Sequence, residues 1–264
     1  MKKILAIMLA VVMMLAVVSC AKKNDEEAPD NEEAAVVEEE VYALEGGDNF
    51  KYATNEDGDY DIIGFSTTNM TPHKVEIPSS INDIRVTGIA DGAFKANNRI
   101  SEVVIPNTVE RIGDFVFYEC TNLAKVTMAN SVTEMGVGAF VKCVALTDIT
   151  LSGELTKIDN FAFWGCVKLA KIVIPAKVTE IGAMAFADCD ILSDVNVPES
   201  VETIGDLAFD ANDALVKITL PATVKNFGVA VFGAENEAIT VVAPAESDAY
   251  KYAAENEYKV EIPA

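Results

Sequence analysis

The chain repeats itself every 23 residues. Seven phenylalanines keep this interval without insertion or deletion: Phe94, Phe117, Phe140, Phe163, Phe186, Phe209 and Phe232. A leucine column, a valine-rich column and a glycine column keep the same register. Self-similarity at this period is typical of solenoids, in which no single repeat can bury its apolar side, so that neighbours stack around one continuous core. We therefore predict a repeat solenoid of seven 23-residue coils within residues 49–264.

Each coil is expected to hold a short parallel β-strand followed by a turn or short helix. Residues 171–175 alternate and are β-branched, and a proline that lacks an N–H group closes the segment. Residues 182–189 favour the turn, with Phe186 pointing inward. The glycine column is interrupted at Ala90 and Asp159. Because aspartate tolerates left-handed backbone geometry better than alanine, we expect the coil with Ala90 to be the irregular one.

Both ends of the solenoid carry segments that differ from the repeat. Residues 52–65, with Asp57 and Gly58 at their centre, predict an N-terminal β-hairpin. Residues 245–256 predict a short C-terminal helix. Terminal repeats need polar caps, so the two segments are interpreted as caps of the leucine-rich-repeat-like solenoid.

The N-terminus predicts export. Lys2 and Lys3 precede an apolar run of 15 residues, which is shorter than the ~20 residues that span a bilayer. Residues 1–19 are therefore predicted to be a signal peptide. Cys20 follows directly, and the junction resembles the lipobox of bacterial lipoproteins, which implies lipidation of Cys20 and an extracytoplasmic, membrane-anchored location. An ordinary secretory signal with a chance cysteine is the alternative.

The segment after Cys20 is acidic and of low complexity. Eleven acidic residues face two lysines between residues 21 and 48, so residues 20–48 are predicted to be a lipidated cysteine with a disordered linker. The formal net charge of the chain is −22. Phosphate backbones and anionic lipid surfaces repel such a protein, which excludes nucleic acid and leaves the lipid anchor as the only predicted membrane contact.

Four cysteines share one column of the repeat: Cys120, Cys143, Cys166 and Cys189. The column needs small apolar side chains, so we predict a buried ladder of free thiols; disulfides between adjacent coils and a metal site are the alternatives. Zinc sites favour paired cysteines or histidines, and His73 is the only histidine. Histidine-based catalytic triads are therefore excluded, and we predict no enzyme activity, no metal and no cofactor.

Charged residues alternate in sign down two columns: Glu102, Lys125, Asp148, Lys171, Asp194 and Lys217 in one, and Arg111, Glu134, Lys157 and Glu180 in the other. We expect ladders of ion pairs between coils, whose main effect is to fix the register; a ligand-binding role is the alternative. Beside the first column runs an uncharged strip on the outward side of the strands. The candidate binding residues are Thr127, Thr150, Val173, Asn196 and Thr219, with the aromatic Trp164 as a further candidate.

The pattern Ile-Gly-x-x-Ala-Phe-x-x-Cys-x-x-Leu-x-x-Ile-x-Ile-Pro, whose first nine positions are matched in full by residues 181–189, resembles the BspA-type leucine-rich repeat family of bacterial surface proteins. The resemblance covers about residues 50–260. It implies a cell-surface binding or adhesion module whose partner is a protein or glycan of the host matrix or of other cells. A structural protein of the envelope or cell wall is the alternative function.

Overall fold

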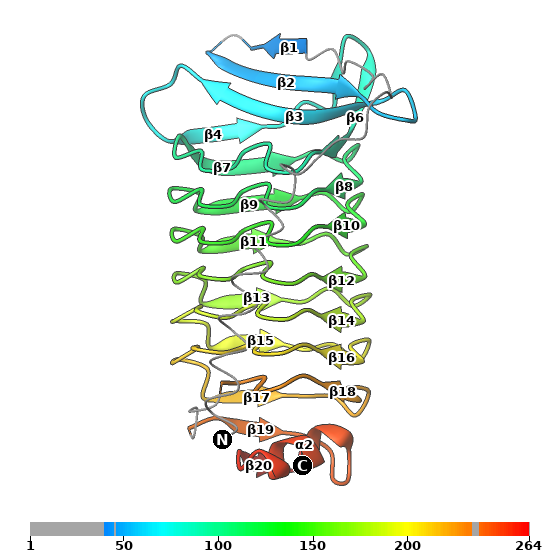
Figure 1. The fold of residues 1–264 in the computed structure, drawn as a ribbon, viewed down its shortest axis with the longest axis vertical. Helices are drawn as coiled ribbons and strands as arrows, with labels where there is room; N and C mark the ends of the chain where they lie inside the picture. The colour runs from blue at the N-terminus through cyan, green and yellow to red at the C-terminus, as the bar shows by residue number, and fades with distance from the viewer. Residues whose placement is uncertain (1–39, 45, 234–237, 264) are drawn as a thin grey trace, which may run out of the picture. The chain divides into compact units, whose positions relative to one another are not determined.

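The computed structural model describes residues 40–44, 46–233 and 238–263. The predicted signal peptide, Cys20 and the predicted linker up to residue 39 lie outside the described residues. Within them the 23-residue repeats form successive coils of a β-solenoid, stacked in chain order (Figure 1). The repeat architecture predicted from the spacing of the phenylalanines is confirmed.

Each coil contributes two short strands, and equivalent strands form two rows. The first row consists of β4 (His73–Glu76), β7 (Ile100–Ile105), β9 (Lys125–Met128), β11 (Asp148–Thr150), β13 (Lys171–Val173), β15 (Asp194–Asn196), β17 (Lys217–Thr219), β19 (Thr240–Val242) and β20 (Lys259–Glu261). The second row consists of β6 (Ile84–Ile89), β8 (Arg111–Ile112), β10 (Glu134–Met135), β12 (Lys157–Ile158), β14 (Glu180–Ile181), β16 (Thr203–Ile204) and β18 (Asn226–Phe227). Pairing within both rows is parallel, and in the repeats each residue lies opposite its equivalent 23 positions on.

The second row was not predicted as strands. Two-residue strands such as Arg111–Ile112 are too short for a periodicity to show them. The sequence nevertheless predicts that the charged residues of neighbouring coils face each other in this row, and Glu134 does lie opposite Arg111.

The segment between the second strand and the next first strand is a turn in every described repeat. The backbone N–H of Phe140 donates to the carbonyl O of Ala162 across 2.9 Å, and the other column phenylalanines from Phe94 to Phe209 make equivalent bonds to the following coil. Two positions in each turn have positive φ, such as Phe161 at 58° and Asp188 at 55°. Of the predicted turn or short helix, the structure therefore has the turn, and its backbone hydrogen bonds run both within the coil, as from Cys143 N–H to Phe140 O, and to the next coil.

The glycine column is explained by close approach, and the expectation of left-handed geometry there was wrong. A Cβ atom at Gly205 would lie 2.7 Å from the carbonyl carbon of Gly182 in the preceding coil. The coil with Ala90 is irregular in its strand pairing, because the register shifts both between β6 and β3 and between β4 and β7. The backbone bond at Ala90 itself is nevertheless regular. Ala90 N–H donates to Ile62 O across 2.8 Å, as the glycines donate to the preceding coil. Asp159 makes no such bond to the preceding coil in the described chain.

Both strand rows are interrupted at the same place in the stack. In the first row β11 does not pair with β13, and in the second β10 does not pair with β12. The break coincides with Asp159, whose carboxylate instead accepts from the N–H of Asn160 and lies 3.5 Å from Lys157 Nζ. We call this interruption the seam.

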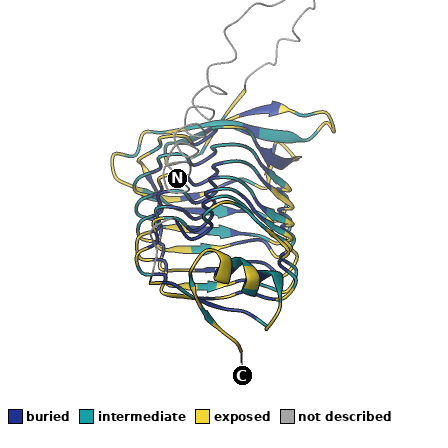
Figure 2. Cartoon of the chain, turned by 60° about the horizontal axis from the view of Figure 1, so that its bottom comes forward, coloured by how far each residue is buried: buried dark blue, intermediate teal, exposed yellow. Residues whose placement is uncertain are grey.

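The core is a single column of apolar side chains inside the coils. All seven repeat phenylalanines are buried, and successive rings from Phe94 to Phe232 stack with centroids 5.1 to 6.0 Å apart. The burial view shows this interior enclosed by strands with exposed turns (Figure 2). The inward direction predicted for the phenylalanines is confirmed.

Both predicted caps are present. Strands β2 (Asp48–Thr54) and β3 (Tyr60–Thr67) form the antiparallel hairpin, and β3 continues into the second row through β6. Helix α2 (Asp248–Glu255) covers the other end, where Ala249 and Ala253 face the core and the remaining side is more exposed (Figure 2). A two-residue strand, β5 (Ser80–Ile81), pairs with β6.

Ordered structure begins earlier than the sequence indicated. Strand β1 (Glu40–Ala43) pairs antiparallel with β2, so residues 40–44 and 46–48 do not belong to a disordered linker. Tyr42 and Leu44 pack against the core, and the hydroxyl of Tyr52 donates to Glu40 across 2.5 Å. These apolar contacts hold the edge strand, whereas the high acidic content of the segment had favoured a linker.

Candidate functional site

The strand-face strip, formed by Thr127, Thr150, Val173, Asn196 and Thr219, lies on the outward side of the first row. The strands that carry it stack one above another from β9 to β17 (Figure 1). Thr150 lies opposite Thr127, and Asn196 lies opposite both Val173 and Thr219. Thr127 is half-buried and the other four are exposed, Val173 at 69%. The structure thus brings the five predicted residues to one uncharged face.

Beside the strip stands the outer charge column, formed by Glu102, Lys125, Asp148, Lys171, Asp194 and Lys217. Lys125 lies opposite both Glu102 and Asp148, and Lys171 lies opposite Asp194, as predicted, but few members of the column form ion pairs with each other. Lys125 Nζ lies 3.7 Å from Glu102, whereas Lys217 pairs with Glu261 of β20. Asp148, Lys171 and Asp194 have no ion-pair partner within 4.0 Å among the described residues. The column therefore has ion pairs at its two ends and none in its middle among the described residues.

The second charge column is likewise only partly paired within itself. Lys157 Nζ lies 3.1 Å from Glu180 in the next coil, as predicted. Arg111 turns away from Glu134 and approaches Asp61 of the hairpin at 3.4 Å. Glu134 has no ion-pair partner in the described chain.

Trp164 lies in the turn after the seam, and its polar and aromatic groups are already occupied. Its Nε1 donates to Asp188 Oδ2 across 2.6 Å, and Lys142 Nζ lies 5.5 Å from the ring centroid. Phe161 packs against the ring edge-on at 6.3 Å. These neighbours belong to turns, and no strip residue is among them. Trp164 therefore packs between coils and lies apart from the strip, and its role in binding stays a prediction.

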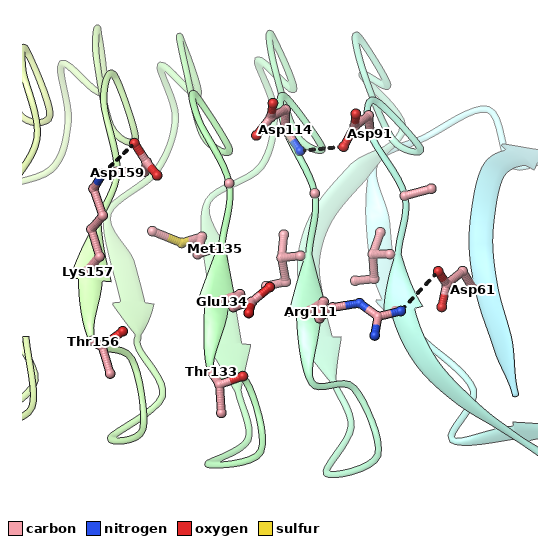
Figure 3. A pocket seen from close by; sticks show the side chains of 16 residues that line it. Asp61, Asp91, Arg111, Asp114, Thr133, Glu134, Met135, Thr156, Lys157 and Asp159 are labelled. Carbon is pink, nitrogen blue, oxygen red and sulfur yellow. Dashed lines mark hydrogen bonds and ion pairs between the residues drawn. The ribbon is translucent and has the colours of Figure 1, made fainter. Parts of the chain in front are cut away.

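A groove runs along the second row, with a volume of about 510 Å³. Gly88, Gly113 and Gly136 are among its lining residues, and the last two belong to the glycine column, which leaves no side chains there. It begins near Asp61 and ends at Asp159, where a side chain replaces glycine (Figure 3). Sequence reasoning missed this groove, although two departures from the glycine column, Ala90 and Asp159, lie among its lining residues.

The groove is lined by more carboxylates than cations. Its two cationic groups are compensated, Arg111 by Asp61 and Lys157 by Asp159 (Figure 3). Lys157 also pairs with Glu180 of the next coil. Asp91 and Asp114 line the opposite wall. Their Oδ1 atoms accept the backbone N–H groups of Asp114 and Val137, each 23 residues on, at 2.8 and 2.7 Å. Burial raises the pKa of Asp114. These two carboxylates thus link coils.

The four cysteines form the buried, unpaired column that the repeat predicted. Each thiol donates to the carbonyl O of a phenylalanine in the preceding coil; for Cys120 and Phe94 the distance is 3.1 Å. Burial raises the pKa of the Cys120 thiol to about 12 and that of Cys166 well above its usual range. Asn212 replaces cysteine in its coil, and its Nδ2 donates to Phe186 O across 2.9 Å.

The remaining conspicuous groups also have structural contacts. His73 begins β4, and its Nε2 lies 2.9 Å from Asp48 in the hairpin. Among the described residues no cluster of three or more histidine, cysteine or acidic side chains could hold a metal ion. In the same residues no helix has the length and apolar character needed to cross a bilayer. Cys20 lies outside the described residues.

Comparison with known families agrees with the repeat seen in the structure. Residues 87–213 and 156–254 match a family model described as a BspA type leucine rich repeat region, in six copies. No curated protein matched the chain.

Solved structures with the same fold come from bacterial proteins. A leucine rich cell surface protein from Faecalibacterium prausnitzii A2-165 is 31% identical, with a TM-score of 0.68 over 83% of this chain and 57% of that one. The chain thus spans a little over half the length of that protein. The T. pallidum leucine rich repeat protein is 27% identical, with a TM-score of 0.62 over 80% of this chain and 95% of that one.

Proposed function

Because the chain belongs to the BspA-type leucine-rich repeat family of bacterial surface proteins, we propose that it is a non-catalytic adhesion module that binds a protein or glycan through the strand-face strip. Leucine-rich repeat folds are generally binding scaffolds without catalytic activity. Its partner would be a protein or glycan of the host matrix or of other cells.

The observation that carries this proposal is that most columns of the repeat join one coil to the next, whereas the strip does not. The phenylalanine, cysteine and glycine columns and the carboxylates of Asp91 and Asp114 are all occupied in joining one coil to the next. Four of the five strip residues are exposed and Thr127 is half-buried, and the strip side chains make no hydrogen bond or ion pair in the described chain. They form a regular uncharged face on a rigid stack, which suits recognition of an extended partner.

The location that we propose is the bacterial cell surface, with a lipid on Cys20 as the anchor and the acidic residues up to 39 as the spacer. The support is the position of Cys20 directly after the apolar run. In cells, Cys20→Ala should move the protein from the membrane to the soluble extracytoplasmic fraction and remove the mass of the acyl chains. Unchanged mass and membrane retention would contradict lipidation, and retention in the cell-wall fraction without lipid would favour the structural envelope function.

The binding face can be tested with two matched double variants in the Cys20→Ala background. Thr150→Arg with Thr219→Arg places two arginines on the strip. Thr133→Arg with Thr156→Arg makes the same chemical change on the exposed residues that line the groove. Both pairs change the net charge equally, so general electrostatics cannot separate them.

The readout is binding to immobilised matrix proteins and to a glycan array. We expect the strip variant to lose at least about 90% of the signal of the parent and the groove variant to keep it. Loss only in the groove variant would move the site to the second row. A parent that binds neither array would contradict the adhesion function itself.

A further inference from the structure

The outer charge column has the order of signs that a self-pairing surface needs. From Glu102 to Lys217 the six charges alternate, starting negative and ending positive. The first two members pair with each other and the last pairs with Glu261. The three members between them, Asp148, Lys171 and Asp194, are exposed and have no ion-pair partner in the described chain. Their charges remain available to a partner.

The column and strip together form a charge-neutral face on a strongly acidic protein. Three carboxylates are balanced by three lysines in the column, and the strip is uncharged, whereas the whole chain carries −22. Like-charged proteins repel each other, and the repulsion is screened within ~8 Å at physiological salt. Two copies of this chain can therefore approach most easily through this face.

An antiparallel arrangement of two copies makes every charge in the column complementary. A two-fold axis between β11 and β13 places Asp148 of each copy opposite Lys171 of the other. Lys125 then faces Asp194, and Glu102 faces Lys217. A parallel two-fold arrangement, or a slip of the antiparallel pair by one coil, places like charges together, so only alternate registers of the antiparallel pair are allowed.

The positions beyond the column agree with the same axis. Lys74 aligns with Glu102 in the stack, and Thr240 aligns with Lys217. The two-fold axis therefore places Lys74 of one copy opposite the uncharged Thr240 of the other. Within the strip, exposed Val173 of one copy faces Thr150 of its partner.

We propose that a partner of the strand-face strip is a second copy of this chain, docked antiparallel through the strip and the outer charge column. The inference rests on the proposed function, since it takes the strip as the binding face and names its occupant. Antiparallel docking places the N-terminal ends of the two solenoids, where the spacers begin, at opposite ends of the pair. This geometry suits contact between proteins anchored on two facing cells.

The pairing is expected to be weak for a single pair of molecules. Six strands at ~4.8 Å spacing give a face only ~25 Å long, and exposed ion pairs contribute ~0.2–1 kcal/mol each. Stable dimers bury ~800 Å² on each partner, more than a face a few residues wide provides. A dissociation constant of about 10–100 µM is therefore expected, and many copies on two surfaces would act together.

The test uses sedimentation velocity of the Cys20→Ala chain and two charge-reversal variants in that background. In a homodimer, Lys171→Asp places two carboxylates together at both central contacts, and Asp148→Lys places two ammonium groups together there. Each variant alone should weaken dimerisation at least about tenfold. An equimolar mixture restores opposite charges at both central contacts, so dimers should return to within about threefold of the parent affinity.

Lys168→Asp is the matched control, because it makes the same charge change, one positive charge lost and one negative charge gained, on an exposed turn residue outside the column. Its docking face is intact, so it should dimerise more tightly than Lys171→Asp. A parent that stays monomeric at about 300 µM would overturn the inference, as would a mixture that remains monomeric or a control as weak as Lys171→Asp. The array experiment is independent of this result: ligand binding without dimers leaves the adhesion function standing, and dimers without ligand binding leave this inference standing.

Discussion

The rings of Phe140 and Phe163 stack with centroids 5.5 Å apart and planes 3° apart, directly across the seam. Neither strand row is continuous there. The two sides are joined by this ring pair and by turn hydrogen bonds, such as Phe140 N–H to Ala162 O at 2.9 Å and Lys142 N–H to Trp164 O at 2.7 Å. The core is therefore continuous where the sheets are not.

The first prediction is that Phe163→Ala uncouples the two sides of the seam. Truncating a buried phenylalanine costs ~3–5 kcal/mol, and here it also removes the stacking that crosses the seam. Unfolding in urea should then occur in two steps, since coils interact only with their neighbours. Trp164 fluorescence and far-ultraviolet circular dichroism should give midpoints that no longer coincide.

Phe209→Ala is the control for this prediction, because the coils around Phe209 are joined by both strand rows. It should lower the midpoint while leaving the two probes coincident. Coincident transitions in Phe163→Ala as well would show that the turn hydrogen bonds alone couple the two sides.

The second prediction is that Asp159→Gly repairs the seam in the second row. A glycine at this position can approach the preceding coil, so that its N–H reaches the carbonyl of Met135 as Gly136 N–H reaches Ile112 O at 2.8 Å. Lys157 keeps its contact with Glu180. We expect a higher urea midpoint and stronger hydrogen-exchange protection of the amide at residue 159.

The opposite substitution tests the same explanation. Gly205→Ala would place a Cβ atom 2.7 Å from the carbonyl carbon of Gly182, and overpacking of this kind costs ~1–3 kcal/mol. If Gly205→Ala were neutral, close approach would not be the reason for the glycine column.

The parts of the fold that follow from the period were predictable, and the parts that depend on one side chain were not. Spacing alone placed Phe163 in the core and Thr150 opposite Thr127. A period cannot tell which neighbour a long side chain approaches. Arg111 pairs with Asp61 of the hairpin, which lies outside the repeat, and leaves Glu134 unpaired. The predicted ladder therefore failed at the residue where the cap meets the first coils.

The candidate site was predictable to a similar extent. Alternation along each strand identified the outward strip, and its exposure bears this out for Val173 and its neighbours. No sequence motif predicted the groove, because it lies where glycine residues have no side chains. Asp159 was visible as a departure from the pattern, but the loss of pairing in both rows depends on three-dimensional contacts around it. Residue type alone suggested Trp164 as a binding residue, and nothing in the sequence indicated its contacts with Lys142 and Asp188.

The third prediction concerns the pH dependence that Asp114 gives to stability. Burial raises the pKa of this carboxyl in the folded protein, and the neighbouring charge of Asp91 acts in the same direction. A raised folded-state pKa means that deprotonation opposes folding, so the contribution of Asp114 to stability is lost as the pH rises through its titration range. Asp114→Asn should therefore raise the melting temperature at pH 7, and the gain should vanish at pH 3.

Asparagine is a fitting replacement because the chain already uses it in this column. Asn160 Oδ1 accepts the N–H of Ala183 across 2.7 Å, as Asp114 Oδ1 accepts that of Val137. Asp114→Ala removes this acceptor and should lower the melting temperature at both pH values. A gain for Asp114→Asn that is equal at pH 7 and pH 3 would contradict the electrostatic explanation.

The fourth prediction is that the thiol column is unreactive until the coils separate. Thiolates are the reactive form, and burial raises the pKa of Cys120 and Cys189 to about 12. In the Cys20→Ala chain, 5,5′-dithiobis(2-nitrobenzoic acid) at pH 8 should label none of the four thiols in native buffer and all four in urea. Fewer than four in urea, with a mass deficit of about 2 Da per missing pair, would reveal disulfides between coils.

The seam sets the order in which these thiols become accessible. Cys143 and Cys166 belong to the turns on its two sides, whereas Cys120 and Cys189 each lie one coil farther away. In Phe163→Ala, mass spectrometry after brief labelling should therefore find Cys143 and Cys166 modified first. Equal labelling of all four would mean that the solenoid opens as one unit, and the seam would then be a local feature of the sheets without effect on the cooperativity of unfolding.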